Sequence, residues 1–179
     1  KVLDKNFPKD IEIRGEVFIL NSDFKNLNSK FSNPRNTASG SLRQKDPNQT
    51  KKIPLRFIAY TYGFYENLNL NKQSEFLEKL KRWGFKVNKY NKVINGKDNL
   101  IKHHKEMENK RVQIDYDIDG LVYKINDFKL QNRLGYLSSS PRWATAHKFS
   151  AEKAISKIIS IEIQIGRTGA LTPVAKIKP

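Results

Sequence analysis

The chain has 179 residues, of which 34 are lysine or arginine and 18 are aspartate or glutamate, so its formal net charge at pH 7 is +16. Hydrophobic residues make up 37% and aromatic residues 11%, enough to fill a domain core, and no stretch approaches the roughly 20 apolar residues of a membrane span. The absence of cysteine excludes disulfides and thiolate metal sites and is compatible with a reducing compartment.

The excess of positive charge favours a polyanionic partner, most simply nucleic acid. Chains rich in lysine and asparagine also become basic through genome composition alone, so the charge by itself leaves both explanations open. The chain begins at Lys1 rather than at a methionine, and we therefore expect that its natural start is absent.

Apolar and polar side chains alternate over residues 11–20, which predicts a strand with Glu16 in the middle of its polar face. Small and turn-forming residues then follow over 33–43, where we expect a loop that leads into a short helical turn. Two arginines, Arg35 and Arg43, flank this segment.

Residues 55–63 predict a strand that ends at Gly63. Tyr60 lies on this strand, either as a core residue or as a platform on which a base could stack. A helix is predicted over 74–83, with Gly84 as its C-terminal stop.

A second amphipathic helix is predicted over 99–110. Its expected inner face consists of Leu100, Ile101, His104 and Met107. Because His103 and His104 are adjacent, they cannot share a helix face, and packed or solvated histidines are favoured over a metal site.

Residues 117–126 predict a further strand that carries Asp119 and Lys124. Strict alternation places these two side chains on opposite faces, whereas a bulge at Gly120 would bring them together. Both arrangements stay open from the sequence.

The stretch 142–149 predicts a strand with two different faces. Arg142 and Lys148 lie on one face and are separated by alanines, which leaves room for an anionic group. The other face carries Trp143, Thr145, His147 and Phe149 and suits a core. The alternative is an edge strand that carries charges for solubility.

Beyond residue 150, isoleucines alternate with polar residues over 159–165, a turn is expected at 166–169, and another strand follows over 171–177. Two strands cannot close a barrel or a sandwich by themselves. We therefore expect the beginning of a second domain, with domains over 1–152 and 153–179.

Charged residues recur on several of these strands, and their chemistry suits phosphoryl transfer. Cations neutralise phosphate, carboxylates hold Mg²⁺ or a ribose hydroxyl, and an aromatic ring stacks a base. The two arginines of 33–43 could clamp phosphates through bidentate hydrogen bonds.

Five stretches, in order, resemble the nucleotidyltransferase core of the NAD-dependent bacterial DNA ligases. They are Glu-Ile-Arg-Gly-Glu-Val-Phe (12–18), Asn-Pro-Arg-Asn-Thr-Ala-Ser-Gly-Ser-Leu-Arg (33–43), Asp-Ile-Asp-Gly-Leu-Val-Tyr-Lys (117–124), Pro-Arg-Trp-Ala-Thr-Ala-His-Lys-Phe (141–149) and Gln-Ile-Gly-Arg-Thr-Gly-Ala-Leu-Thr-Pro-Val-Ala (164–175). The second and fifth are particular to the NAD-dependent branch, and the resemblance covers essentially the whole chain.

The resemblance implies an α+β fold, with an antiparallel-rich, ATP-grasp-like nucleotidyltransferase core followed by the first strands of an OB-fold. It also implies sealing of 3′-hydroxyl/5′-phosphate nicks in double-stranded DNA during replication and repair. The AMP donor would be NAD⁺, Mg²⁺ or Mn²⁺ would assist, and the protein would be a cytoplasmic bacterial monomer. Zinc would belong to a C-terminal region absent from this chain.

The resemblance also implies a role for each site residue. Glu16 would contact the AMP ribose or the metal, Asp119 would serve the metal, and Tyr60 would stack on adenine. Lys124 and Lys148 would act on the AMP phosphate. The resemblance also implies DNA phosphate contacts near the nick for Arg35 and Arg43, and a further functional arginine at Arg111.

The family's nucleophile is the lysine of a Lys-x-Asp-Gly motif upstream of the stretch that matches 12–18, and this chain has no such tetrapeptide. We therefore expect an internal fragment, truncated at both ends, that cannot adenylate itself. The alternatives are an ATP-dependent ligase or capping-type nucleotidyltransferase, and a non-catalytic basic module that binds nucleic acid.

Overall fold

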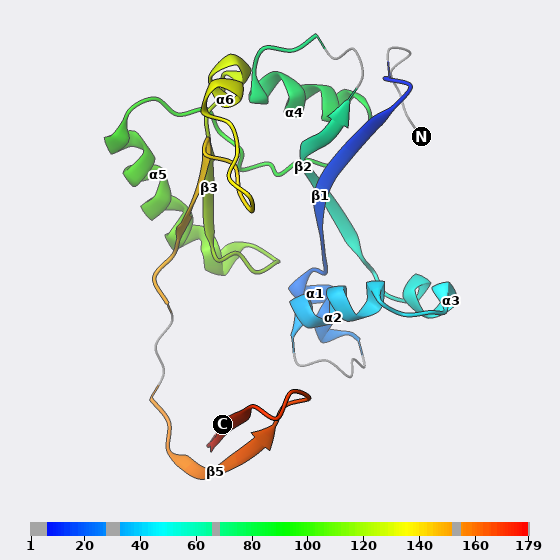
Figure 1. Cartoon of the computed structure of the whole chain (residues 1–179), viewed down its shortest axis with the longest axis vertical. Coiled ribbons are helices and arrows are strands. Elements are labelled where there is room, and N and C mark those ends of the chain that lie inside the picture. Colours follow the sequence, from blue (N-terminus) through cyan, green and yellow to red (C-terminus); the bar gives the residue numbers. More distant parts are fainter. Residues whose placement is uncertain (1–6, 28–32, 66–68, 152–154, 179) are drawn as a thin grey trace. The chain divides into compact units, whose positions relative to one another are not determined.

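The computed structural model describes residues 7–27, 33–65, 69–151 and 155–178 (Figure 1). These residues form helices and antiparallel strands, which confirms the predicted α+β class. The chain divides into two compact units, Lys1–Phe149 and Ser150–Pro179. The predicted boundary between residues 152 and 153 lies outside the described residues.

The first unit begins with β1 (Ile11–Phe18), which pairs antiparallel with β2 (Arg56–Tyr65). Exposure alternates along β1 as the sequence predicts, although β1 ends two residues earlier and β2 ends two residues later than expected. Gly15 is required at the crossing of the two strands, because a Cβ there would lie 2.4 Å from the Ile58 carbonyl oxygen.

Three short helices lie between these strands. They are α1 (Asn21–Lys25), α2 (Pro34–Leu42) and α3 (Pro47–Lys51). The nine-residue α2 corrects the prediction of a loop with a short helical turn. Its start explains the difference, since the Asn33 side chain caps the helix by accepting a hydrogen bond from the Asn36 amide at 2.8 Å, and Pro34 occupies the first turn.

One hydrophobic core forms where α4 (Gln73–Arg82) packs beside β2 (Figure 1). Its buried members are Ala59, Phe76, Leu80, Trp83 and Phe128. The last of these belongs to α6 (Phe128–Leu134), so this core also holds the segment that follows β3 (Gly120–Lys124). The predicted helix over 74–83 is confirmed, and Gly84 ends it with a φ of 88°.

A second core lies under α5 (Lys97–Lys110), the 3₁₀ turn η1 (Arg111–Gln113) and the segment after it. Met107, Ile114 and Phe149 are its buried members. The predicted inner face of α5 is wrong for Ile101, which is 40% exposed. His104 and Met107 lie within about 60° of each other around the helix axis and form the buried stripe of α5. Ile101 lies at the edge of this stripe.

β3 (Gly120–Lys124) and β4 (Ala144–Lys148) form the second antiparallel pair and are shorter than predicted. Their register is continuous, so Gly120 forms no bulge, and Asp119 and Lys124 stay on opposite faces. Gly120 instead allows β3 and β4 to approach each other closely, because a Cβ at this position would lie 2.3 Å from the His147 carbonyl oxygen.

The two faces of β4 differ from the prediction in one respect. Trp143 and Phe149 are buried as expected, but Thr145 and His147 are exposed. β3 and β4 form a two-stranded ladder, so only part of this face is covered. The His147 ring stacks on buried His104, with ring centroids 3.6 Å apart.

The second unit is a hairpin of β5 (Ile158–Ile165) and β6 (Leu171–Ile177). The expected turn is confirmed, since the Gly169 amide donates to the Gly166 carbonyl at 2.9 Å and Gly169 has a φ of 81°. Among the described residues, no helix has the length and apolar character that crossing a membrane requires.

Candidate functional site

A cavity of about 500 Å³ lies where α2 meets the β1–β2 ladder. Its lining residues are Gly15, Glu16, Val17, Arg35, Ser39, Leu42 and Tyr60. The fold therefore brings together three residues that the sequence singled out in three separate segments: Glu16, Arg35 and Tyr60. A carboxylate, a guanidinium and an exposed aromatic ring around one cavity can serve a ligand with hydroxyl, phosphate and aromatic groups.

The position of α2 decides which of its side chains reach this cavity. Thr37, Ala38 and Ser41 are buried, so this face of the helix is covered. Arg35 and Ser39 are one turn apart and both line the cavity. Arg43 follows the last helical residue, is exposed and is not among the lining residues, so the two arginines are placed differently.

Lys124 lies over Tyr60. Its ammonium nitrogen is 4.8 Å from the centre of the Tyr60 ring and 3.5 Å from the Tyr60 carbonyl oxygen. Burial lowers the pKa of Lys124 from 10.5 to about 8, because the charged form loses solvation. The contact joins a residue of the β3–β4 ladder to one of the β1–β2 ladder, so the candidate site draws on both.

Asp119 gives a second connection to the cavity. Its carboxylate lies 3.6 Å from the Arg35 guanidinium, and both side chains are exposed, so the pair is worth only about 0–1 kcal/mol. Arg35 thus pairs with Asp119 rather than with Asp46, an acidic residue that lies closer to it in the sequence. Asp46 instead caps α3 by accepting from the Asn48 amide at 2.9 Å.

Two further predicted site residues, Lys148 and Arg111, are not among the residues that line the cavity. Lys148 is exposed at the end of β4, and its carbonyl oxygen lies 3.2 Å from the Nε2 atom of His104. Because opposite residues of an antiparallel pair point to the same side, Lys148 shares a face with Lys124. Arg111 begins η1, away from the residues that line the cavity.

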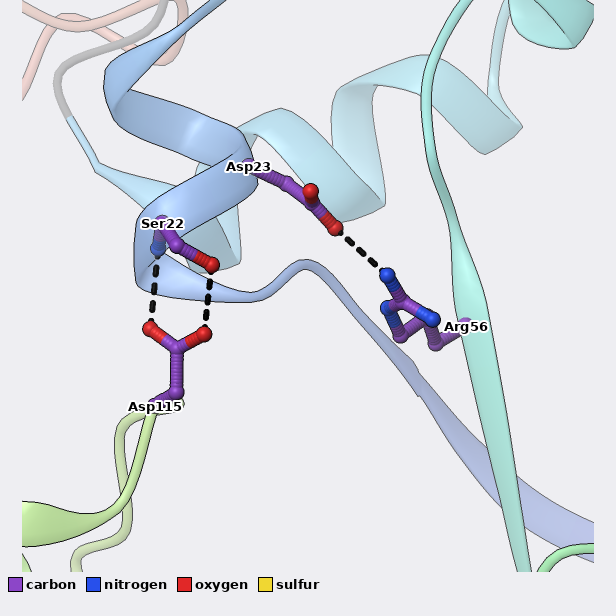
Figure 2. Close-up of polar contacts among 4 residues, drawn as sticks. All are labelled: Ser22, Asp23, Arg56 and Asp115. Carbon is purple, nitrogen blue, oxygen red and sulfur yellow. Dashed lines mark hydrogen bonds and ion pairs between the residues drawn. The ribbon is translucent and has the colours of Figure 1, made fainter.

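Figure 2 shows two polar contacts that position α1. The Asp115 carboxylate accepts hydrogen bonds from the Ser22 amide at 2.9 Å and from the Ser22 hydroxyl, and Arg56 reaches Asp23 at 2.8 Å. The Ser22 hydroxyl, and then its amide, lower the pKa of Asp115. Since Asp115 precedes Asp119 by four residues, this contact fixes the segment that leads into β3 relative to the end of β1.

Of the predicted metal ligands, Glu16 lies on β1 and Asp119 directly precedes β3. Within the described ranges, no group of three or more histidine or acidic side chains is arranged to hold a metal ion. Two carboxylates fit the way Mg²⁺ is bound in many nucleotide sites, where one or two carboxylates are completed by substrate phosphates and water.

Comparison with known proteins decides the family. Residues 1–152 match the NAD-dependent DNA ligase adenylation domain. The chain belongs to this adenylation-domain family. A DNA ligase of Pelagibacter ubique is 63% identical over 179 residues, covering 100% of the chain and 26% of that ligase. A DNA ligase of Bartonella bacilliformis is 49% identical over 187 residues and one of Rhizobium etli 48% over 185, with 26% of each covered.

This adenylation-domain chain therefore spans about a quarter of the length of the curated ligases that it matches, as the 26% coverage shows. The family match confirms the resemblance stated from the motifs and does not favour the ATP-dependent alternative. Sequence reasoning missed Ser39, although its spacing from Arg35 could have indicated it. It also missed the buried amides Gln73 and Gln131, for which the sequence carries no signal.

Proposed function

We propose that this chain forms the AMP-binding part of a DNA ligase that seals nicks in double-stranded DNA with NAD⁺ as the AMP donor. The observation that carries the proposal is the joint placement of Glu16, Arg35 and Tyr60 around one cavity, with Lys124 over the Tyr60 ring. These residues come from separate segments of the chain, and their chemistry matches the separate parts of an adenylate.

Each side chain would act on a different part of AMP. Tyr60 would stack on adenine, because its exposed ring offers a π surface at the cavity. Glu16 would accept hydrogen bonds from the ribose hydroxyls. Lys124 and Lys148, on one face of the β3–β4 ladder, would neutralise the phosphate.

Mg²⁺ would add positive charge at the phosphates, with Glu16 and Asp119 as its protein ligands. Arg35 lines the cavity beside Glu16 and so would act on AMP as well as on the DNA phosphates assigned to it by its motif. Arg43, outside the cavity lining, would contact the DNA backbone alone. Arg111 would serve as a further positive charge along the bound nucleic acid.

The second unit would contribute the first two strands of an OB-fold, with domains over 1–152 and 153–179. Its support is the apolar pattern of the hairpin: isoleucines 158, 159, 161, 163 and 165 are all more than half exposed. Such a hairpin requires further strands to bury its apolar side chains. We propose that the intact protein supplies them.

The test uses a full-length ligase that carries this chain, with NAD⁺ or ATP as the donor and a nicked duplex as substrate. Tyr60→Ala and Lys124→Ala should each slow AMP transfer from NAD⁺ by about 10²-fold, since each removes a contact to the transferred group. Phe64→Ala is the matched control, because Phe64 is an exposed aromatic residue on the same strand, outside the cavity. Sealing with ATP alone, or unchanged AMP transfer in both site variants, would overturn the proposal.

A further inference from the structure

Two buried glutamines connect the strand of Tyr60 to the strand of Lys124. Gln73 and Gln131 are 6% and 4% exposed. The Gln73 side-chain amide donates to the Tyr60 carbonyl oxygen at 3.1 Å, and the Gln131 side-chain amide donates to the Ile125 carbonyl oxygen at 2.6 Å. A longer contact of 3.5 Å, from the Gln131 amide nitrogen to the Gln73 side-chain oxygen, joins the two side chains.

We call this series of contacts, from the Tyr60 carbonyl through Gln73 and Gln131 to the Ile125 carbonyl, the Gln73–Gln131 relay. The two carbonyls at its ends determine the orientation of both side-chain amides. Each glutamine faces a backbone carbonyl, which only accepts hydrogen bonds, so each must present its NH₂ group there. The Gln73 oxygen is then left to accept from Gln131. Glutamate or methionine at either position cannot reproduce the relay, because neither side chain carries an NH₂ group.

The relay spans two ladders that share no strand. Tyr60 lies on β2, and Ile125 directly follows Lys124, the last residue of β3. The backbone adds to the connection, since the Gln73 amide donates to the Asn126 carbonyl at 2.7 Å. The start of α4 is thereby fixed to both strands, at the point where the Lys124 ammonium meets the Tyr60 carbonyl.

We propose that Gln73 and Gln131 are positioning residues that hold the Lys124 ammonium in register with the Tyr60 ring, and so place the phosphate-binding charge relative to the adenine platform. The inference rests on the proposed function, because it assigns no contact of its own with the nucleotide. It also explains why two polar side chains lie beside an aromatic core, where an unpaired amide would be costly.

The test measures AMP transfer from NAD⁺ in a full-length ligase carrying this chain, both in the parent and in a Lys124→Ala background. Gln131→Met keeps a similar side-chain volume and removes the donor, and Gln73→Met repeats the test at the other end if the first variant does not fold. The control is Leu77→Ala, on the helix α4 that carries Gln73, where a partly buried leucine packs against the core and has no hydrogen-bonding group. The thermal unfolding midpoint of each variant is also measured, so that rates are compared between variants of similar stability.

In the parent background, each methionine variant should slow AMP transfer about tenfold, the size expected for one buried hydrogen bond. In the Lys124→Ala background the same change should slow it less than about threefold, because residues that act through one another are not additive. Equal slowing in both backgrounds, or slowing no greater than in Leu77→Ala, would overturn the inference. An unchanged rate in the Lys124→Ala single variant would remove Lys124 from the proposed function, and would overturn the inference with it.

Discussion

Binding of an adenylate beside Lys124 should draw a proton from solvent. Burial holds the pKa of Lys124 at about 8, so at pH 8 about half of the molecules carry a neutral amine. A phosphate placed next to this amine favours the ammonium form and returns its pKa toward the ordinary value of 10.5. Each binding event should therefore take up about half a proton at pH 8 and about a tenth of a proton at pH 7.

Calorimetric titration of AMP into a full-length ligase carrying this chain, in two buffers of different ionisation enthalpy, measures this uptake. The AMP phosphate contributes almost nothing at pH 8, because the second pKa of a phosphate monoester is about 6 and its ionisation is therefore nearly complete at pH 8. Lys124→Arg is the matched control, since arginine keeps the charge and the capacity to bind phosphate but stays protonated throughout this range. Equal proton uptake in the parent and in Lys124→Arg at pH 8 would refute the reasoning.

Three further predictions concern stability and the division of labour between the arginines. Lys124→Met should raise the free energy of unfolding of this chain at pH 7 by at most about 3 kcal/mol, and by less after solvent screening, and so raise its unfolding midpoint, because the parent lysine regains solvation on unfolding. The unfolded chain binds more protons than the folded chain between pH 8 and 10.5, so the parent gains stability across that window and the advantage of the variant shrinks; a lower midpoint at pH 7 would contradict this. Asp115→Asn should lower the midpoint at pH 7, and the difference should shrink as the pH falls below about 4 and through the lowered pKa of Asp115, because the hydrogen bonds from Ser22 favour the ionised carboxylate; a difference of equal size at pH 3 would count against it. Arg35→Ala should slow both AMP transfer from NAD⁺ and nick closure by about 10²-fold, whereas Arg43→Ala should affect only the DNA steps, and single-turnover kinetics with the same loss in both variants would remove the distinction.

Much of the local structure could be predicted from the sequence, because the periods of exposed and buried residues differ between helices and strands. The alternation over 11–20 and the apolar spacing over 74–83 identified β1 and α4. The failure at Ile101 arose where an apolar residue sits at the edge of a helix stripe, so that tertiary packing rather than hydrophobicity decides its burial. For α2, a cap at Asn33 outweighed a composition typical of loops.

The site itself could be anticipated residue by residue through its motifs, but its assembly could not. A possible bulge at Gly120 left two arrangements of Asp119 and Lys124 open, and only the continuous pairing that includes Gly120 and Lys148 decided between them. Contacts between residues far apart in the chain depend on how the β1–β2 and β3–β4 ladders are placed relative to each other. The pattern of a single strand contains no information about a partner such as Gln131.

The connections that hold the two ladders near the cavity differ in strength. Arg35 and Asp119 are exposed, so their contact contributes about 0–1 kcal/mol, whereas leaving one end of a buried amide relay unpaired costs about 1–3 kcal/mol. The Gln73–Gln131 relay thus determines where Lys124 lies, and the Arg35–Asp119 pair can open at little cost. A phosphate that competes for Arg35 would release the Asp119 carboxylate at the cavity. On the proposed function, this carboxylate becomes available as a metal ligand only when the nucleotide has arrived.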